Sequence, residues 1–207
     1  MTKARENSDY TGLQAEIVAG DTAARAGRKN LILNGSMQIS QRGDYTSAST
    51  ISNGNYYLDR IMSYAGNVTG TIQDMGGSIK HVSTLSATGY LGAEQRIEDY
   101  ARLSGKTITI SADVRSNSTD TRIQIYDSAY RYGDNAHSGG GGWEKLTQTF
   151  TVSTSLTRLW IQLWISGSST LNTAIASGDY VEFKNLQVEE GSVATDFEHR
   201  SYGEELA

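Results

Sequence analysis

The pattern of apolar and polar residues at positions 103–115 alternates with a period of two. The apolar residues all share one parity: Ile108, Ile110, Ala112 and Val114. Such alternation is typical of a half-buried β-strand. Turn-forming residues bound it on both sides, at Ser104-Gly105 and at positions 116–118. We expect the rest of the chain to repeat this design.

Further strands follow from the same signals. Residues 30–39 form an apolar run closed by Asn34-Gly35, which predicts a strand and a turn. Residues 68–75 and 78–85 flank Gly76-Gly77, which predicts a hairpin with a primed turn. More strands are expected at three places: 121–126, 144–152 and 158–166.

The last predicted strand, residues 179–189, contains a change of parity. Val181 and Phe183 fall on one face, whereas Leu186 and Val188 fall on the other. One inserted residue, a β-bulge near Lys184-Asn185, would return all four apolar side chains to the core. The number and spacing of these strands favour an all-β sandwich.

Residues 128–142 lack such a pattern and hold Tyr130, Tyr132 and a run of four glycines. We interpret them as a long loop, in which tyrosines beside small polar residues make an adaptable contact surface. The glycine run is not followed by the Gly-Lys-Ser/Thr of a phosphate-binding loop, which argues against nucleotide binding.

The first 29 residues differ in character from the rest and are rich in Ala, Arg, Glu and Asp. A capping-box spacing at Thr11 precedes a thin apolar stripe: Leu13, Ile17 and Val18. A helix this short is marginal alone. The segment is therefore either an attachment and assembly arm that needs a partner surface or a disordered tail, and residues 30–207 form the main domain.

Composition narrows the class of protein. A chain of 207 residues suits one all-β domain with a short appendage, and a net charge of -5 argues against a nucleic-acid partner. With no cysteine there is no disulfide framework and no thiolate metal site. The charged N-terminus is no signal peptide, and no apolar run is long enough for membrane insertion.

Several segments together resemble the carbohydrate-binding-module-like jelly rolls at the ends of bacteriophage fibre proteins. They are residues 30–35 with 41–43, and then 57–60, 103–115, 143–152 and 185–191. The most specific is the closing run at 194–206, which looks very like the end of tail-fibre and fibre-like virion proteins. The resemblance implies a jelly-roll β-sandwich that forms a homotrimer in the virion and is assembled in the host cytoplasm. It also implies attachment to other virion proteins through residues 1–29.

The chain departs from this family at informative positions. Asp196 stands where proline is usual, and the family commonly continues past the Glu-Glu-Leu-Ala that ends this sequence. Related sugar-binding modules often carry Phe-Glu after the Asn-Gly turn, and that carboxylate helps to hold a structural calcium. Met37 and Gln38 stand there in this chain, which puts the calcium in doubt. No cofactor is expected.

The candidate ligand contacts centre on residues 158–166, where Trp160, Gln162 and Trp164 share one face. Two indoles flanking an amide suit a sugar, because aromatic rings stack on pyranose C–H faces and the amide bonds hydroxyls. In a trimer the same tryptophans would instead be interface core. Tyr130 and Tyr132 are further candidate contacts, and Trp143 is interpreted as a loop anchor with ligand contact as the alternative.

Catalytic and metal signals are absent from the sequence. The three histidines are far apart, so no metal site is expected, and there is no Gly-x-Ser-x-Gly elbow. No pair of carboxylates is singled out for glycoside hydrolysis. The sequence therefore favours a non-enzymatic tail-fibre or spike component that binds host surface polysaccharide. A head fibre or capsid decoration protein is the first alternative, and a polysaccharide depolymerase is the second.

Overall fold

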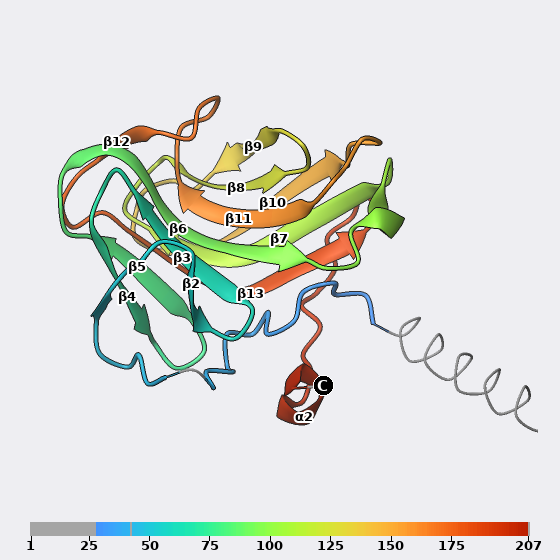
Figure 1. The fold of residues 1–207 in the computed structure, drawn as a ribbon, viewed down its shortest axis with the longest axis horizontal. Coiled ribbons are helices and arrows are strands. Elements are labelled where there is room, and N and C mark those ends of the chain that lie inside the picture. Colours follow the sequence, from blue (N-terminus) through green and yellow to red (C-terminus); the bar gives the residue numbers. More distant parts are fainter. Residues whose placement is uncertain (1–27, 42, 207) are drawn as a thin grey trace, which may run out of the picture.

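The computed structural model describes residues 28–41 and 43–206, which fold into two facing antiparallel sheets (Figure 1). From edge to edge, sheet A contains β1 (Ser49–Thr50), β4 (Gly70–Asp74), β5 (Ile79–Ser83), β13 (Tyr180–Glu190), β7 (Thr107–Ser116) and β10 (Trp143–Thr151). Sheet B contains β2 (Asn55–Leu58), β3 (Ile61–Gly66), β6 (Ala87–Ile97), β11 (Leu159–Ile165), β8 (Thr121–Tyr126) and β9 (Tyr130–Ala136). The remaining elements are β12 (Thr173–Ile175), which pairs with β6, a 3-10 turn η1 (Ala101–Leu103) and helix α2 (Tyr202–Leu206).

The strand order identifies the sandwich as a jelly roll. Strands β5 to β13, with β12 left out, can be counted as the first to the eighth strand of the motif. The order in sheet A is then first, eighth, third and sixth, and in sheet B it is second, seventh, fourth and fifth. Two interlocked Greek keys give this arrangement. The predicted all-β jelly-roll fold is confirmed.

The core lies between the sheets and is built from the alternating positions that the sequence predicts. On β7 the inward residues are Ile108, Ile110, Ala112 and Val114, all at most 1% exposed. The register of β13 against β7 shifts between Lys184 and Gln187, so both Phe183 and Leu186 are buried. The predicted bulge is confirmed. The predicted hairpin is confirmed as well, since β4 and β5 pair across Gly76 and Gly77, both with positive φ.

The strand predicted at residues 30–39 is wrong. Asn34 and Met37 adopt positive φ, and the segment has no strand ladder. Side-chain amides replace the ladder bonds: Asn34 Oδ1 accepts from the backbone N–H groups of Gln38 and Ile39 at 3.0 and 2.9 Å. Asparagine side chains compete with regular structure in this way, so the apolar run is buried without becoming a strand.

The loop predicted at residues 128–142 is only partly correct, because β9 occupies its centre. β9 is an edge strand paired with β8. A Cβ on Gly133 would lie 2.4 Å from the Ile123 carbonyl oxygen, so glycine permits the close approach of the two strands. An edge strand with a glycine on its packed side gives little apolar alternation, and its sequence therefore reads as a loop.

The two ends of the described chain are joined to each other and to β13. The Asn30 side chain donates to the Leu186 carbonyl at 3.1 Å and accepts from the Val188 N–H at 3.0 Å. The Asn30 N–H donates to Glu198 Oε2 at 2.7 Å, and the Arg200 guanidinium donates to the Asn30 carbonyl. We call this contact the terminal seam.

The proposed arm lies largely outside the described residues, and so do Leu13, Ile17 and Val18. Only its last two residues, Arg28 and Lys29, are described. In the described part of the chain, no helix is both long enough and apolar enough to cross a membrane.

A buried histidine links the two sheets. His81 on β5 is fully buried, its Nε2 lies 2.9 Å from Ser63 Oγ on β3, and its ring stacks on Phe183. Burial lowers the pKa of His81 from 6.5 to about 3. Between these two pH values the unfolded chain binds a proton at His81 that the folded chain does not bind. Stability therefore falls as the pH drops through this window.

We predict that the titration of His81 lowers the unfolding free energy of the protein by about 2 kcal/mol when the pH is lowered from 7 to 5. The His81→Gln variant keeps a polar side chain and removes the titration, so its unfolding free energy falls less over the same interval. Urea unfolding at the two pH values measures the difference. His199→Gln, an exposed histidine, is the matched control. Equal pH dependence of wild type and His81→Gln would contradict the prediction.

Candidate functional site

The two outer faces of the sandwich differ in what covers them. Residues 191–201, which we call the closing segment, run along the outer face of sheet A. Glu189 Oε2 accepts from the Thr195 N–H at 3.0 Å, and Gln187 Oε1 accepts from the Glu198 N–H at 2.8 Å. Gln187 and Glu189 point outward from β13 and are nevertheless buried. Sheet B has no such cover within the described residues, so its outer face is the open one.

Rows of outward side chains cross sheet B, each centred on an outward residue of β11: Trp160, Gln162 or Trp164. Their partners on β6 are, in that order, Arg96, Glu94 and Gly92. Their partners on β8 are Tyr126, Gln124 and Arg122, and Tyr130 and Tyr132 extend two of the rows onto β9. Five of the six sequence-predicted contacts therefore share this face. The sixth, Trp143, lies on β10 of sheet A, between Arg115 and Lys184.

Two glycines let aromatic rings lie flat at one end of the face. The Trp164 ring stacks on Tyr90 with 4.7 Å between centroids and 9° between planes, and its Nε1 donates to the Ala93 carbonyl at 2.7 Å. A Cβ on Gly66 would lie 2.0 Å from the Tyr90 ring, and one on Gly92 would lie 2.7 Å from the Trp164 ring. Trp164 is therefore buried beneath the surface, and Tyr90 forms that end of it.

The centre of the face is polar and buried. Glu94 accepts from Gln162 Nε2 at 2.8 Å and from Arg96 Nε at 2.9 Å. Gln162 Oε1 and Gln124 Nε2 have no hydrogen-bond partner in the described part of the chain. Buried polar atoms are normally paired, so this row retains unused hydrogen-bonding capacity.

At the other end of the face, the Trp160 ring is flanked by side chains of the two neighbouring strands, β8 and β6. The Tyr126 ring lies 4.8 Å from it on the β8 side, and the Arg96 guanidinium lies 4.7 Å from the ring centroid on the β6 side. The Arg158 guanidinium lies 5.2 Å from the same ring. Trp160 is half-buried in this arrangement.

Five tyrosines lie on this face: Tyr130 is exposed, and the other four are half-buried, namely Tyr64, Tyr90, Tyr126 and Tyr132. Burial raises the pKa of Tyr64 and of Tyr90, and the nearby negative charge of Glu94 raises both further. Burial also raises the pKa of Tyr130 and Tyr132. These hydroxyls are therefore protonated at neutral pH and can both donate and accept hydrogen bonds.

Sequence reasoning did not select Tyr64, Tyr90 or Arg96, which come from β3 and β6. Tyr126, on the outward parity of its predicted strand, was visible but not chosen. The signal that could have found all four is the outward parity of β6 and β8, which flank β11, and of β3, which lies beside β6. Using it requires knowing which strands pair.

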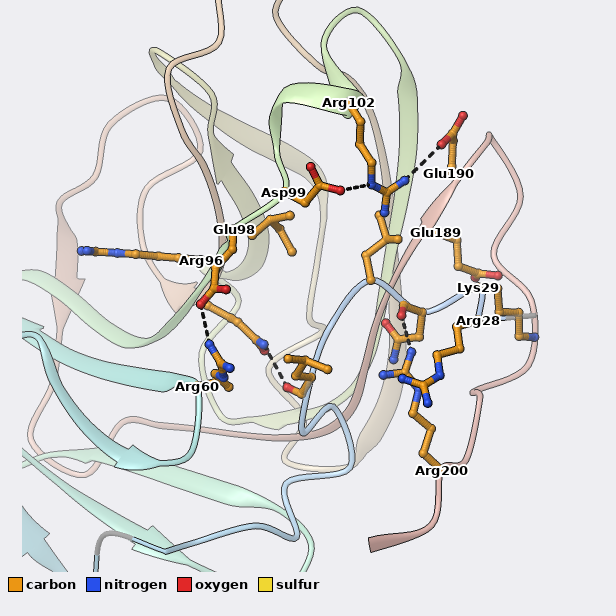
Figure 2. Close-up of a pocket in the computed structure, with 15 residues that line it drawn as sticks. Arg28, Lys29, Arg60, Arg96, Glu98, Asp99, Arg102, Glu189, Glu190 and Arg200 are labelled. Atoms are coloured by element: carbon orange, nitrogen blue, oxygen red, sulfur yellow. Dashed lines mark hydrogen bonds and ion pairs between the residues drawn. The ribbon is translucent and has the colours of Figure 1, made fainter. Parts of the chain in front are cut away.

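A separate pocket of about 650 Å³ lies where the terminal seam meets the connection between β6 and β7 (Figure 2). Two of its cations pair with its acids: Arg60 reaches Glu98, and Arg102 lies between Asp99 and Glu190. These ion pairs compensate part of the charge on its walls.

Most arginines of the described chain lie within 4.0 Å of a carboxylate: Arg60, Arg96, Arg102, Arg115, Arg122, Arg131 and Arg200. Arg158, the exposed residue immediately before β11, has no carboxylate partner among residues 28–41 and 43–206. Within the same residues, no group of three or more His, Asp or Glu side chains is arranged to hold a metal ion.

Comparison with known proteins finds solved structures that are similar to the chain at low sequence identity. No family model and no curated protein matches the chain. Among solved structures, the CBM22-1 xylan-binding domain of Paenibacillus barcinonensis Xyn10C is 11% identical with a TM-score of 0.45, over 73% of this chain and 99% of that one. A CBM4 structure is 17% identical with a TM-score of 0.42, over 76% and 98%.

A third similar structure is the enzymatically active domain of bacteriophage CBA120 tailspike protein 4. It is 14% identical with a TM-score of 0.42, over 78% of this chain and 21% of that one. These three structures are thus two carbohydrate-binding modules and one domain of a phage tailspike.

We predict that Gly66→Ala disrupts the flat aromatic end of the face. The added Cβ would overlap the Tyr90 ring, so Tyr90 must move and its stacking on Trp164 is lost. We expect a loss of about 1–3 kcal/mol of unfolding free energy and a changed near-ultraviolet circular dichroism spectrum. Gly142→Ala, whose Cβ would meet no atom within 4 Å, is the control. A spectrum of Gly66→Ala identical to wild type would count against this packing.

Proposed function

We propose that the protein binds a glycan on the outer face of sheet B and does not act on it chemically. The observation that carries the proposal is the convergence of five tyrosines and Trp160 on one uncovered face, around a buried row of carboxylate and amide groups. Aromatic rings stack on the C–H faces of sugars, and tyrosine hydroxyl groups can donate hydrogen bonds to sugar hydroxyls and accept hydrogen bonds from them.

The extent of the face suits an extended ligand. Strands in a sheet lie about 4.8 Å apart, so the path from β3 to β9 across β6, β11 and β8 is roughly 20 Å wide. This width accommodates several sugar residues in a row. An oligosaccharide or a stretch of polysaccharide fits such a surface better than one monosaccharide does.

The chemistry of the face supports binding over hydrolysis. Glycoside hydrolysis requires two carboxyl groups placed on either side of the scissile bond. Glu94 is 3% exposed and is held by Gln162 and Arg96, so it fixes the polar row in place and is not free to serve as an acid or base.

We further propose that the protein belongs to a phage virion, as a tail-fibre or spike component that is assembled as a homotrimer and recognises host surface polysaccharide. The support is the closing run at 194–206, with its resemblance to the ends of fibre-like virion proteins. In this proposal residues 1–29 attach the domain to other virion proteins.

Glycan binding is tested by removing one exposed ring. Tyr130→Ala is expected to weaken the affinity for a bound glycan about tenfold, since one aromatic contact is worth about 0.5–1.5 kcal/mol beyond its area. An immobilised glycan array finds the ligand, and titration calorimetry measures it. Trp143→Ala is the matched control, because Trp143 and Tyr130 are 40% and 38% exposed but lie on opposite sheets. Loss of binding in Trp143→Ala with none in Tyr130→Ala would place the site on sheet A.

The assembly proposal is tested by light scattering on the full chain and on a chain that begins at Lys29. We expect a trimer for the first and a monomer for the second, because a trimer that is held together by the arm leaves the tyrosine face open. A trimer for both would favour the face of sheet B as the subunit interface.

A further inference from the structure

One end of the sheet B face, at Arg158, Arg96 and Trp160, is cationic, and this charge bears on which glycans the face can bind. This inference rests on the proposed function and asks which sugar chemistry the face selects. Arg158 and Arg96 lie at the same end of the face, with their guanidinium carbons 5.2 and 4.7 Å from the centroid of the Trp160 ring. Both guanidinium groups therefore border the same indole ring.

Arg158 differs from the arginines that stabilise the fold. It makes no hydrogen bond or ion pair that involves the described residues, and its contacts are with the faces of Trp160 and Tyr126, at 5.2 and 5.9 Å. Stacking on rings holds the guanidinium in position but uses none of its five N–H donors. The donors of Arg158 therefore face solvent from a fixed place beside the aromatic surface.

Arg96 is partly committed to the protein. Its Nε donates to Glu94, and one terminal nitrogen lies 3.5 Å from the Tyr64 hydroxyl. Its side chain is still 45% exposed. Because Glu94 compensates the charge of Arg96, Arg158 supplies the net positive charge at this end of the face, on a chain whose overall charge is -5.

We propose that the bound glycan is acidic and that an anionic group of one sugar, a carboxylate or a sulfate ester, is held by Arg158 with Arg96 as its neighbour. A guanidinium fork matches the two oxygens of such a group. The ring carrying the anion would lie against Tyr126 and the edge of Trp160. Neutral sugar residues of the same chain would cross the polar row toward Tyr90.

The experiment compares acidic glycans with their own neutral forms. The array carries uronic-acid, sialic-acid and sulfated oligosaccharides, each beside a counterpart in which the carboxyl group is methyl-esterified or the sulfate removed. We expect the strongest binding among the acidic members, with affinity that falls as salt increases. If binding is lost on methyl esterification, the recognised anion is a carboxylate. If binding is lost on removal of the sulfate, it is a sulfate ester.

Variants then locate the contact. Arg158→Gln is expected to weaken binding of the acidic glycan about tenfold, as for the loss of one charged hydrogen bond, and to leave binding of its neutral form unchanged. Arg158→Lys keeps the charge but loses the planar guanidinium, so its affinity for the acidic glycan is expected to lie between those of wild type and Arg158→Gln. Lys80→Gln is the control, since Lys80 is also a cation over an aromatic ring, Tyr180, but on sheet A. Unfolding by urea confirms that each variant is folded.

The outcomes separate the two proposals. Equal binding of acidic and neutral forms, with no effect of Arg158→Gln, overturns the acidic preference and leaves glycan binding in place. Equal losses in Arg158→Gln and Lys80→Gln would show a general charge effect and would also overturn it. No binding to any member of the array overturns both proposals.

Discussion

The bulge in β13 is the constraint on which the arrangement of the whole chain depends. Where the register shifts, the backbone of Leu186 leaves the ladder and needs other partners. Its carbonyl accepts from Asn30 Nδ2 at 3.1 Å, and its N–H donates to the Gly35 carbonyl at 2.9 Å. A Cβ at Gly35 would lie 2.3 Å from the Leu186 oxygen, so glycine allows this approach. The segment that begins at Arg28 is thereby fixed against β13, and the closing segment is fixed against it in turn through Arg200.

This order of dependence decides which face is open. The closing segment must follow β13 and then meet Asn30, and the path between them crosses the outer face of sheet A. The outward tyrosines and Trp160 of sheet B stay at least partly accessible as a result. Aromatic and polar side chains can accumulate there because the other parity of the same strands already supplies the core, as Ile161 and Leu163 do on β11.

Local alternation was enough to predict much of the fold. The parity of β7, the hairpin at Gly76-Gly77 and the bulge near Asn185 all follow from residues adjacent in sequence. Residues 30–39 were misread because the Asn34 side chain and partners distant in sequence, such as Val188 and Leu186, satisfy their backbone in place of a strand ladder. Likewise, the tryptophans of β11 were visible in the sequence, whereas Tyr64 and Tyr90 enter the candidate site through the pairing of β3 with β6 and of β6 with β11.

The terminal seam also has a mechanical consequence. The Asn34 N–H donates to Glu205 Oε2 of α2 at 2.5 Å, so the first and last parts of the described chain meet at one edge of the sandwich (Figure 1). A tether attached at either end would pull on this one corner of the domain. The open face of sheet B lies on the side of the sandwich opposite the closing segment, so a domain held at this corner keeps that face unobstructed.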